Sequence, residues 1–126
     1  RVNVNSAFYL TQALLPLLRN SDDGRILFTS SSVGRKGRAF WGAYAASKAA
    51  TENLSQTLAE ELENTSKIRV NTINPGATRT DMRALAYPGE DAEKLKSPEQ
   101  IVASYLYLLG PEGAAINGQS LDAQPR

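Results

Sequence analysis

GRILFTSSS, residues 24–32, is the segment that decides the fold class of this 126-residue chain. Residues 25–30 are apolar in the middle, as parallel strands covered on both faces tend to be. The turn-forming residues 20–24 precede this strand. A stretch rich in Ser, Gly, Arg and Lys follows it, so residues 31–42 are predicted to form a loop.

Helical patterns flank this strand on both sides. Residues 3–19 place apolar side chains on nearly every face of a helix, which predicts burial on more than one side. Residues 43–63 repeat apolar residues every three to four positions, which predicts a long helix: Ala46, Ala50, Leu54, Leu58 and Leu62. Further along, the sequence predicts a strand at 68–74, a short helix at 81–86, a helix at 99–109 that begins with Pro98, and a strand at 119–123.

This alternation of helices and strands predicts an α/β fold. Such an order favours right-handed crossovers and a mostly parallel sheet. Three strands form a thin sheet with exposed edges, so we expect a partner segment or subunit to complete it.

Composition excludes several functional classes. Fourteen Lys and Arg against thirteen Asp and Glu give a net charge of +1, and no basic excess indicates binding to nucleic acid or to an anionic membrane surface. The absence of Cys and His removes disulfides, thiolate catalysis, the commonest general base and the commonest metal ligand, so no metal site is predicted. No stretch approaches the roughly 20 apolar residues that span a bilayer. We expect a cytoplasmic location.

Tyr44 and Lys48 are the first candidate catalytic residues. Four positions apart near the start of the predicted long helix, they project from the same face. An ammonium close to a phenol favours the phenolate, which gives a protein without His a usable acid–base group. A solvated or packing role for an isolated Tyr–Lys pair is the alternative.

Ser31 is the third candidate, because it follows the strand at residues 25–30. Ligands in α/β proteins bind at the carboxyl ends of parallel strands. A hydroxyl at this position can hold a substrate oxygen while the phenol exchanges a proton with it. Alternatively, Ser30, Ser31 and Ser32 satisfy backbone groups of the loop.

Several motifs together resemble the short-chain dehydrogenase/reductase family. Residues 24–34 and 44–50 are similar to its active-site block, and residues 2–4 to its Val-Asn-Leu signature. Residues 68–76 with Thr80 are similar to its strand and loop beside the nicotinamide, and residues 117–119 to the start of its last strand. The resemblance implies the C-terminal half of a Rossmann-like, doubly wound parallel sheet with flanking helices. The polar ending, residues 118–123, together with residues 41–44 and 75–80, is most similar to a poorly characterised bacterial branch of the family.

The resemblance implies a role for each matching residue. Tyr44 would be the general acid or base, Lys48 would hold the nicotinamide ribose, and Ser31 would orient the substrate carbonyl. Asn3 would hold a water molecule in a proton relay. Four residues would contact the cofactor from the loop after the second strand: Pro75, Gly76, Thr78 and Thr80. The cofactor would be NAD(P)(H), with NADP slightly favoured, and the substrate a small carbonyl compound or alcohol.

Departures from the family pattern set further expectations. Phe28 replaces a frequent Asn, a change expected to affect packing more than chemistry, and Thr78 stands where Ile or Val is usual. The family's glycine-rich dinucleotide-binding half is absent from this sequence, so residues 1–126 are expected to be the catalytic half of a single domain. The resemblance also implies a homodimer or homotetramer that pairs the helices at 3–19 and 43–63. The alternative is a non-catalytic fragment or relic that serves as an oligomerisation or binding module.

Other side chains near the predicted site have two interpretations each. Arg35, Lys36 and Arg38 could attract an anionic substrate or a cofactor phosphate, or could belong to a solvated loop. Phe40 and Trp41 could line a substrate pocket, or pack against a neighbouring element. Arg79 could contact the cofactor pyrophosphate, or simply be exposed.

Overall fold

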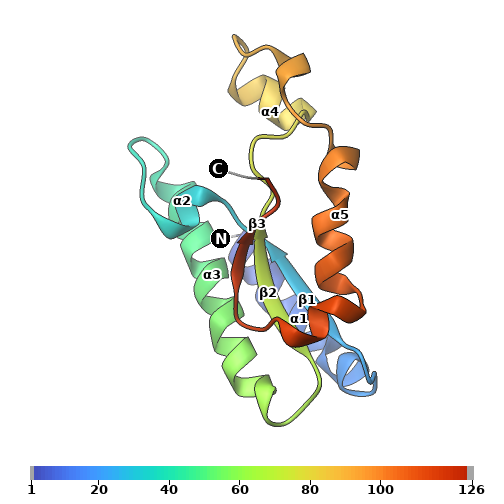
Figure 1. Ribbon diagram of the computed structural model, residues 1–126. Helices are drawn as coiled ribbons and strands as arrows, with labels where there is room; N and C mark the ends of the chain where they lie inside the picture. Colours follow the sequence, from blue (N-terminus) through green and yellow to red (C-terminus); the bar gives the residue numbers. More distant parts are fainter. Residues whose placement is uncertain (1, 125–126) are drawn as a thin grey trace.

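The computed structural model describes residues 2–124, with side chains from residue 4 onward (Figure 1). In chain order its elements are helix α1 (Val2–Arg19), strand β1 (Arg25–Thr29), helices α2 (Ser32–Arg35) and α3 (Gly42–Glu63), strand β2 (Arg69–Asn74), helices α4 (Asp81–Ala86) and α5 (Pro98–Leu109), and strand β3 (Ser120–Asp122). Two 3-10 turns, η1 (Ala92–Lys94) and η2 (Pro111–Ala115), flank α5. The predicted alternation is therefore confirmed, with most boundaries within a residue or two.

Helix α2 corrects the prediction of a continuous loop over residues 31–42. Ser31 is its N-cap, with an extended backbone (φ −152°, ψ 160°), and the Ser31 hydroxyl accepts a hydrogen bond from the Val33 amide. A serine in this position satisfies an amide that a helix start leaves free, so a single turn can form in a sequence of low helical propensity.

The three strands form one parallel sheet in the order β1-β2-β3. Arg25 of β1 lies opposite Arg69 of β2, and Thr72 of β2 lies opposite Ser120 of β3. The central strand β2 is the most deeply buried of the three, because helices cover both of its faces. This confirms the predicted parallel α/β fold.

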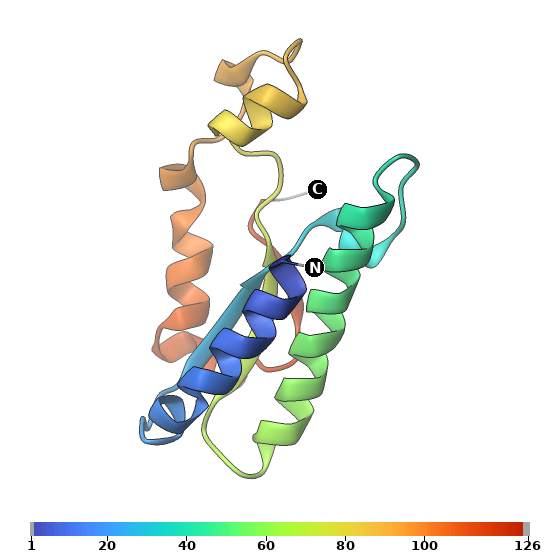
Figure 2. The same ribbon diagram turned by 180° about the vertical axis from the view of Figure 1, so that it is seen from behind.

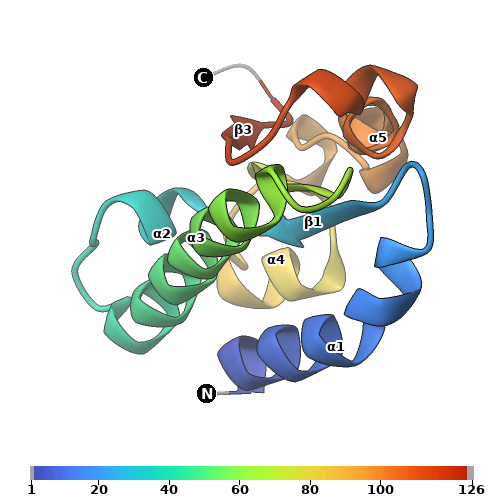
Figure 3. The ribbon, with the colours of Figure 1, turned by 90° about the horizontal axis from the view of Figure 1, so that it is seen from below.

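Helices α1 and α3 cover one face of the sheet and α5 covers the other (Figures 2 and 3). Side chains alternate along a strand, and β2 shows this directly. The Thr72 hydroxyl bonds to Glu52 of α3, whereas the next residue, Ile73, shares a small cavity with Tyr107 of α5. The main core lies on the α1–α3 face and is built from Ala59, Leu62, Ile68 and Val70 with Leu15, Leu18, Ile26, Phe28 and Leu58 packed against them. Phe28 thus has the packing role expected of it.

The two crossovers have opposite hands, which corrects the expectation that both are right-handed. Each connects a strand to its neighbour in the same direction across the sheet. The connection through α3 crosses one face and the connection through α5 crosses the other, as Figure 3 shows. The crossover β1–α3–β2 follows the common right-handed path. The crossover β2–α5–β3 moves in the same direction across the sheet but over the opposite face, so it is left-handed.

Helix α1 is covered on one side only by the described residues. Its outer side exposes five large apolar side chains: Phe8, Tyr9, Leu10, Leu14 and Leu17. Within the chain, the predicted burial on more than one side is therefore not achieved. No helix in the described part of the chain combines the length and apolar character needed to cross a membrane.

Candidate active site

A cavity of about 620 Å³ opens at the carboxyl ends of the strands. One wall comes from the segment after β1 and the start of α3, and the other from the segment after β2 with α4. Six of the predicted site residues line it: Ser31, Tyr44, Pro75, Gly76, Thr78 and Thr80. A concave site at this edge of a parallel sheet is where α/β proteins bind ligands.

Ser31 is positioned by the contact between α2 and α3. The two helices approach so closely that a Cβ at Gly34 would lie 2.9 Å from the Lys48 Cβ and 2.9 Å from the Ser30 Oγ. Only glycine fits here, because any larger residue would push α2 away from α3. The Ser31 hydroxyl accepts from the Val33 amide at 3.4 Å, so its proton remains free for another acceptor. The capping role and a substrate-binding role are therefore compatible.

Tyr44 and Lys48 lie on the first two turns of α3, on the same face, as predicted. The Lys48 Nζ is 5.6 Å from the centroid of the Tyr44 ring. The same ammonium donates a hydrogen bond to the Thr29 carbonyl oxygen at 3.2 Å. Lys48 therefore connects α3 to the end of β1, beside the segment that carries Ser31.

The loop after β2 is held in a defined shape by its own hydrogen bonds. Gly76 has φ +77°, a left-handed conformation that favours glycine, and its amide donates to the Asn74 Oδ1 at 3.1 Å. The Gln124 amide nitrogen donates to the Pro75 carbonyl at 2.9 Å and to the Ala77 carbonyl at 2.8 Å. Gln124 thus fastens the predicted nicotinamide loop to the segment after β3.

Both predicted threonines of this loop also stabilise it. The Thr78 hydroxyl donates to the Gly76 carbonyl at 3.0 Å, and Thr80 caps α4 by accepting from the Arg83 amide at 3.1 Å. The Thr80 hydroxyl proton is free to reach a ligand, whereas the Thr78 proton is already used.

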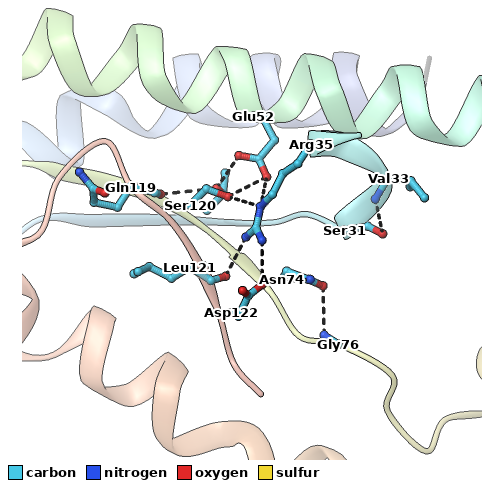
Figure 4. A network of polar contacts seen from close by, with 11 residues as sticks. Ser31, Val33, Arg35, Glu52, Asn74, Gly76, Gln119, Ser120, Leu121 and Asp122 are labelled. Atoms are coloured by element: carbon cyan, nitrogen blue, oxygen red, sulfur yellow. Dashed lines mark hydrogen bonds and ion pairs between the residues drawn. The ribbon is translucent and has the colours of Figure 1, made fainter. Parts of the chain in front are cut away.

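A polar network behind the cavity escaped the sequence analysis (Figure 4). The buried Glu52 carboxylate of α3 accepts from the hydroxyls of Thr72 at 2.8 Å and Ser120 at 2.9 Å. The Arg35 guanidinium of α2 donates to the Ser120 hydroxyl at 2.9 Å and to Asp122 at 2.8 Å, and its Nε is 3.7 Å from Glu52. The network therefore connects α2, α3, β2 and β3 directly behind Ser31.

The structure also distinguishes between the two interpretations that the sequence left open for the basic and aromatic side chains near the site. Arg35 belongs to the polar network, whereas Arg38 lines the cavity. Trp41 also lines the cavity, but Phe40 is fully exposed with φ +70°. Arg79 is exposed, and its amide bonds to the Lys96 carbonyl.

Sequence reasoning missed the residues that α4 contributes to the cavity. Met82, Arg83 and Tyr87 all line it. The Arg83 guanidinium makes two hydrogen bonds to Glu90, at 2.8 and 2.9 Å. This pairing raises the pKa of Arg83 and lowers the pKa of Glu90 from their ordinary values. The sequence predicts a short helix at 81–86, but nothing in its pattern indicates that this helix faces the cavity.

Asn3, the remaining predicted catalytic residue, lies in the first turn of α1. Figure 2 shows that α1 begins near the carboxyl ends of the strands. The side chain of Asn3 is outside the described part of the structure.

Residues 1–91 match the family described as short chain dehydrogenase. The chain belongs to that family. A relative in Escherichia coli K12, the uncharacterized oxidoreductase YciK, is 59% identical over 125 residues, which cover 99% of this chain and 49% of the relative. This agrees with the bacterial branch expected from the polar ending.

Solved short-chain dehydrogenases have the same fold as this chain. One from Pseudomonas syringae is 63% identical with a TM-score of 0.94, covering 98% of this chain and 50% of its own. Another from Shigella flexneri, complexed with NADP, is 59% identical with a TM-score of 0.94, covering 98% and 51%. This short-chain dehydrogenase chain thus spans about half the length of the relatives it matches.

Proposed function

We propose that this chain is the catalytic half of an oxidoreductase that transfers a hydride between NADP(H) and a carbonyl or alcohol substrate. The observation that carries the proposal is that Ser31 and Tyr44 line one cavity opposite the loop that contains Gly76, with the Lys48 ammonium 5.6 Å from the centroid of the Tyr44 ring. The whole enzyme would be about twice as long, with a glycine-rich half that binds the rest of the dinucleotide. It would reside in the cytoplasm.

The cavity suits a nicotinamide ring and a small substrate together. Its lining is mainly apolar and contains no carboxylate, and the hydroxyls of Ser31 and Tyr44 lie on one wall. The loop with Pro75, Gly76 and Thr78 would hold the nicotinamide from the other wall. NADP(H) is preferred over NAD(H) because homologous structures at about 60% identity are complexed with NADP or NADPH. When bound, the cofactor supplies or takes up the hydride.

The protein's own residues would move and hold the proton. In the reducing direction the Tyr44 hydroxyl donates its proton to the carbonyl oxygen, and in the oxidising direction the phenolate accepts a proton from the alcohol. The Lys48 ammonium, 5.6 Å from the centroid of the Tyr44 ring, would stabilise the phenolate and would hold the ribose hydroxyls of the cofactor. The Ser31 hydroxyl, with its proton free, donates a hydrogen bond to the same substrate oxygen. Asn3 would complete a proton relay at the start of α1.

The partners of this enzyme are proposed from its exposed surfaces. Phe8, Leu14 and Leu17 on α1 are too apolar to be left in water as a group, so α1 and α3 are proposed to pair with a second copy in a homodimer or homotetramer. The same surface supports a second candidate function. A short polypeptide without the dinucleotide-binding half would serve only as an oligomerisation or binding module.

Tyr44→Phe in the full-length protein tests the catalytic proposal. We expect turnover of a carbonyl substrate to fall roughly 10²- to 10⁴-fold, because a phenyl ring carries no proton to transfer. NADPH affinity, measured by nucleotide fluorescence, should stay close to the parent value. Comparable turnover in the variant would refute the role of Tyr44.

The intact mass and a nucleotide titration separate the two candidate functions. A protein of about twice this length that quenches or shifts NADPH fluorescence supports the oxidoreductase. A short species that leaves NADPH fluorescence unchanged supports the binding module.

A further inference from the structure

We infer that the natural substrate carries an apolar body and an anionic group, and that Arg38 binds that anionic group. This inference rests on the proposed oxidoreductase function and names the substrate class of the same cavity. The residues concerned lie in the loop between α2 and α3 and in the segment after β2.

An aromatic wall leads from the mouth of the cavity to the catalytic phenol. Its three rings are Tyr87, Trp41 and Tyr44. The Trp41 and Tyr87 rings stack with centroids 6.4 Å apart and an interplanar angle of 22°. The Trp41 and Tyr44 rings meet edge to face at 5.7 Å. A substrate whose carbonyl is at Tyr44 therefore extends along Trp41 toward the mouth, where an apolar body packs best.

Each ring of the aromatic wall has a cation beside it, and only one of the three cations is available. The Arg83 guanidinium lies 3.7 Å from the Tyr87 centroid, but Glu90 holds it through two hydrogen bonds. Lys48 donates to the Thr29 carbonyl and is assigned to the cofactor. Arg38 lies 6.0 Å from the Trp41 centroid and makes no side-chain hydrogen bond or ion pair with the described residues.

The electrostatics of the cavity favour the same substrate class. Two arginines and no Asp or Glu are among the residues that line it. Because Glu90 neutralises Arg83, the uncompensated charge is that of Arg38. Arg38 is exposed, so water screens part of its charge, but the apolar walls beside it strengthen its attraction for an anion inside the cavity. A carboxylate or phosphate at the far end of the substrate would thus meet a cation that is not already paired.

Two contacts of Trp41 limit the distance between Arg38 and Tyr44. The guanidinium carbon of Arg38 is 6.0 Å from the Trp41 ring, and that ring is 5.7 Å from the ring of Tyr44. The guanidinium carbon of Arg38 and the centroid of the Tyr44 ring therefore lie at most about 12 Å apart. An aromatic ring with a short chain is long enough to bridge that distance.

The test uses the full-length enzyme with NADPH and pairs of aryl ketones that differ in one charge. 4-Acetylbenzoate and its homologues with one or two methylenes before the carboxylate are each compared with their methyl esters. We expect kcat/KM for at least one acid to exceed that of its ester by about tenfold, mainly through KM, as one charge-assisted hydrogen bond would provide. In Arg38→Gln this acid-to-ester ratio should fall about tenfold, and in Arg38→Glu the ester should become the preferred substrate.

Lys36→Gln is the matched control, because it removes the same charge from an exposed position two residues away that does not line the cavity. It should keep the acid-to-ester ratio of the parent. An equal loss in Lys36→Gln, a ratio near one in the parent enzyme, or a ratio that Arg38→Gln leaves intact would overturn the inference. Thermal unfolding of each variant establishes that it is folded. If the enzyme reduces the esters without any acid preference, only the substrate class is wrong; if it binds no NADPH, the proposed function itself fails.

Discussion

The polar network behind the cavity makes a quantitative prediction about Arg35. Arg35→Met keeps the length of the aliphatic stem but removes the guanidinium that faces two carboxylates. Glu52 is only 9% exposed in its side chain, so water cannot replace the lost charge there. Asp122 retains 27% exposure and can rehydrate in part.

The expected magnitude follows from that difference in burial. Removing one partner of a fully buried ion pair costs about 3–5 kcal/mol. Since Arg35 itself is 22% exposed and its Nε is 3.7 Å from Glu52, we place the cost of Arg35→Met at about 2–3 kcal/mol. In a Glu52→Gln background no buried carboxylate remains, and the cost should fall to about 1 kcal/mol.

Urea unfolding of the four proteins in this double-mutant cycle measures the coupling directly. The protein concentration must be the same throughout, because an oligomer is stabilised by mass action. Lys36→Met is the control, since Lys36 is exposed and its side chain makes no hydrogen bond or ion pair with the described residues; it should change stability by less than about 0.5 kcal/mol. Two results would refute the reasoning: a cost for Arg35→Met no larger than that of the control, or the same cost in both backgrounds.

Three further predictions follow from other contacts of the site. Gly34→Ala should destabilise the full-length protein by about 1–3 kcal/mol, because the new Cβ would lie 3.0 Å from the Lys48 carbonyl carbon; Gly42→Ala, with nothing within 4 Å, should leave the thermal midpoint unchanged or slightly raised. Lys48→Ala should weaken NADPH binding as well as turnover, and an unchanged dissociation constant would remove its assignment to the ribose. Hydrogen bonds from Arg83 lower the pKa of Glu90 below its ordinary 4.5, so the stability that this pair contributes is present above pH 4.5 and lost as the pH falls through the lowered pKa. The difference in unfolding free energy between the parent and Glu90→Gln should accordingly vanish in acid, and a difference independent of pH would contradict this assignment.

Local patterns predicted the elements well because each is encoded within a few neighbouring residues. The apolar run before Ser31 predicted β1, and Pro98 predicted the start of α5. The spacing of Tyr44 and Lys48 predicted a shared helical face, which the 5.6 Å separation agrees with. A single-turn helix such as α2 has no such pattern, since it depends on one capping hydroxyl and on packing against α3.

The side of α3 that faces the sheet was harder to predict. Its apolar repeat runs through Ala46 and Leu54, yet Ala46 is exposed. The buried stripe instead contains Ala45, Glu52 and Ala59, seven residues apart. Glu52, a carboxylate in the middle of a helix face of small residues, was the available signal for the polar network. It could not be recognised as a buried charge from the sequence, because its hydrogen-bond partner Thr72 lies on a strand that is distant along the chain.

The hand of the second crossover could not be read from the order of elements. Either hand has the same sequence of helices and strands, and the statistical preference favours the wrong one here. What decides it is the distribution of apolar surface between the two faces of β2. The lining of the cavity could not be predicted for a similar reason. Trp41 and Tyr87 are far apart in the sequence, and their rings meet only because α4 folds over the ends of the strands.

The exposed Phe40 has a practical consequence for handling this protein. Its ring is fully in solvent at a loop tip, two residues from Arg38, with a backbone conformation rare for a bulky residue. Such a tip is a preferred point of attack for chymotrypsin, which cuts after aromatic residues. A single nick there would divide Ser31 from Tyr44 in the covalent chain, while the sheet and its helices hold both fragments in place. The rate of that nick, followed on a gel as candidate ligands are added, would report any ligand that orders the loop between Arg38 and Trp41, both of which line the cavity.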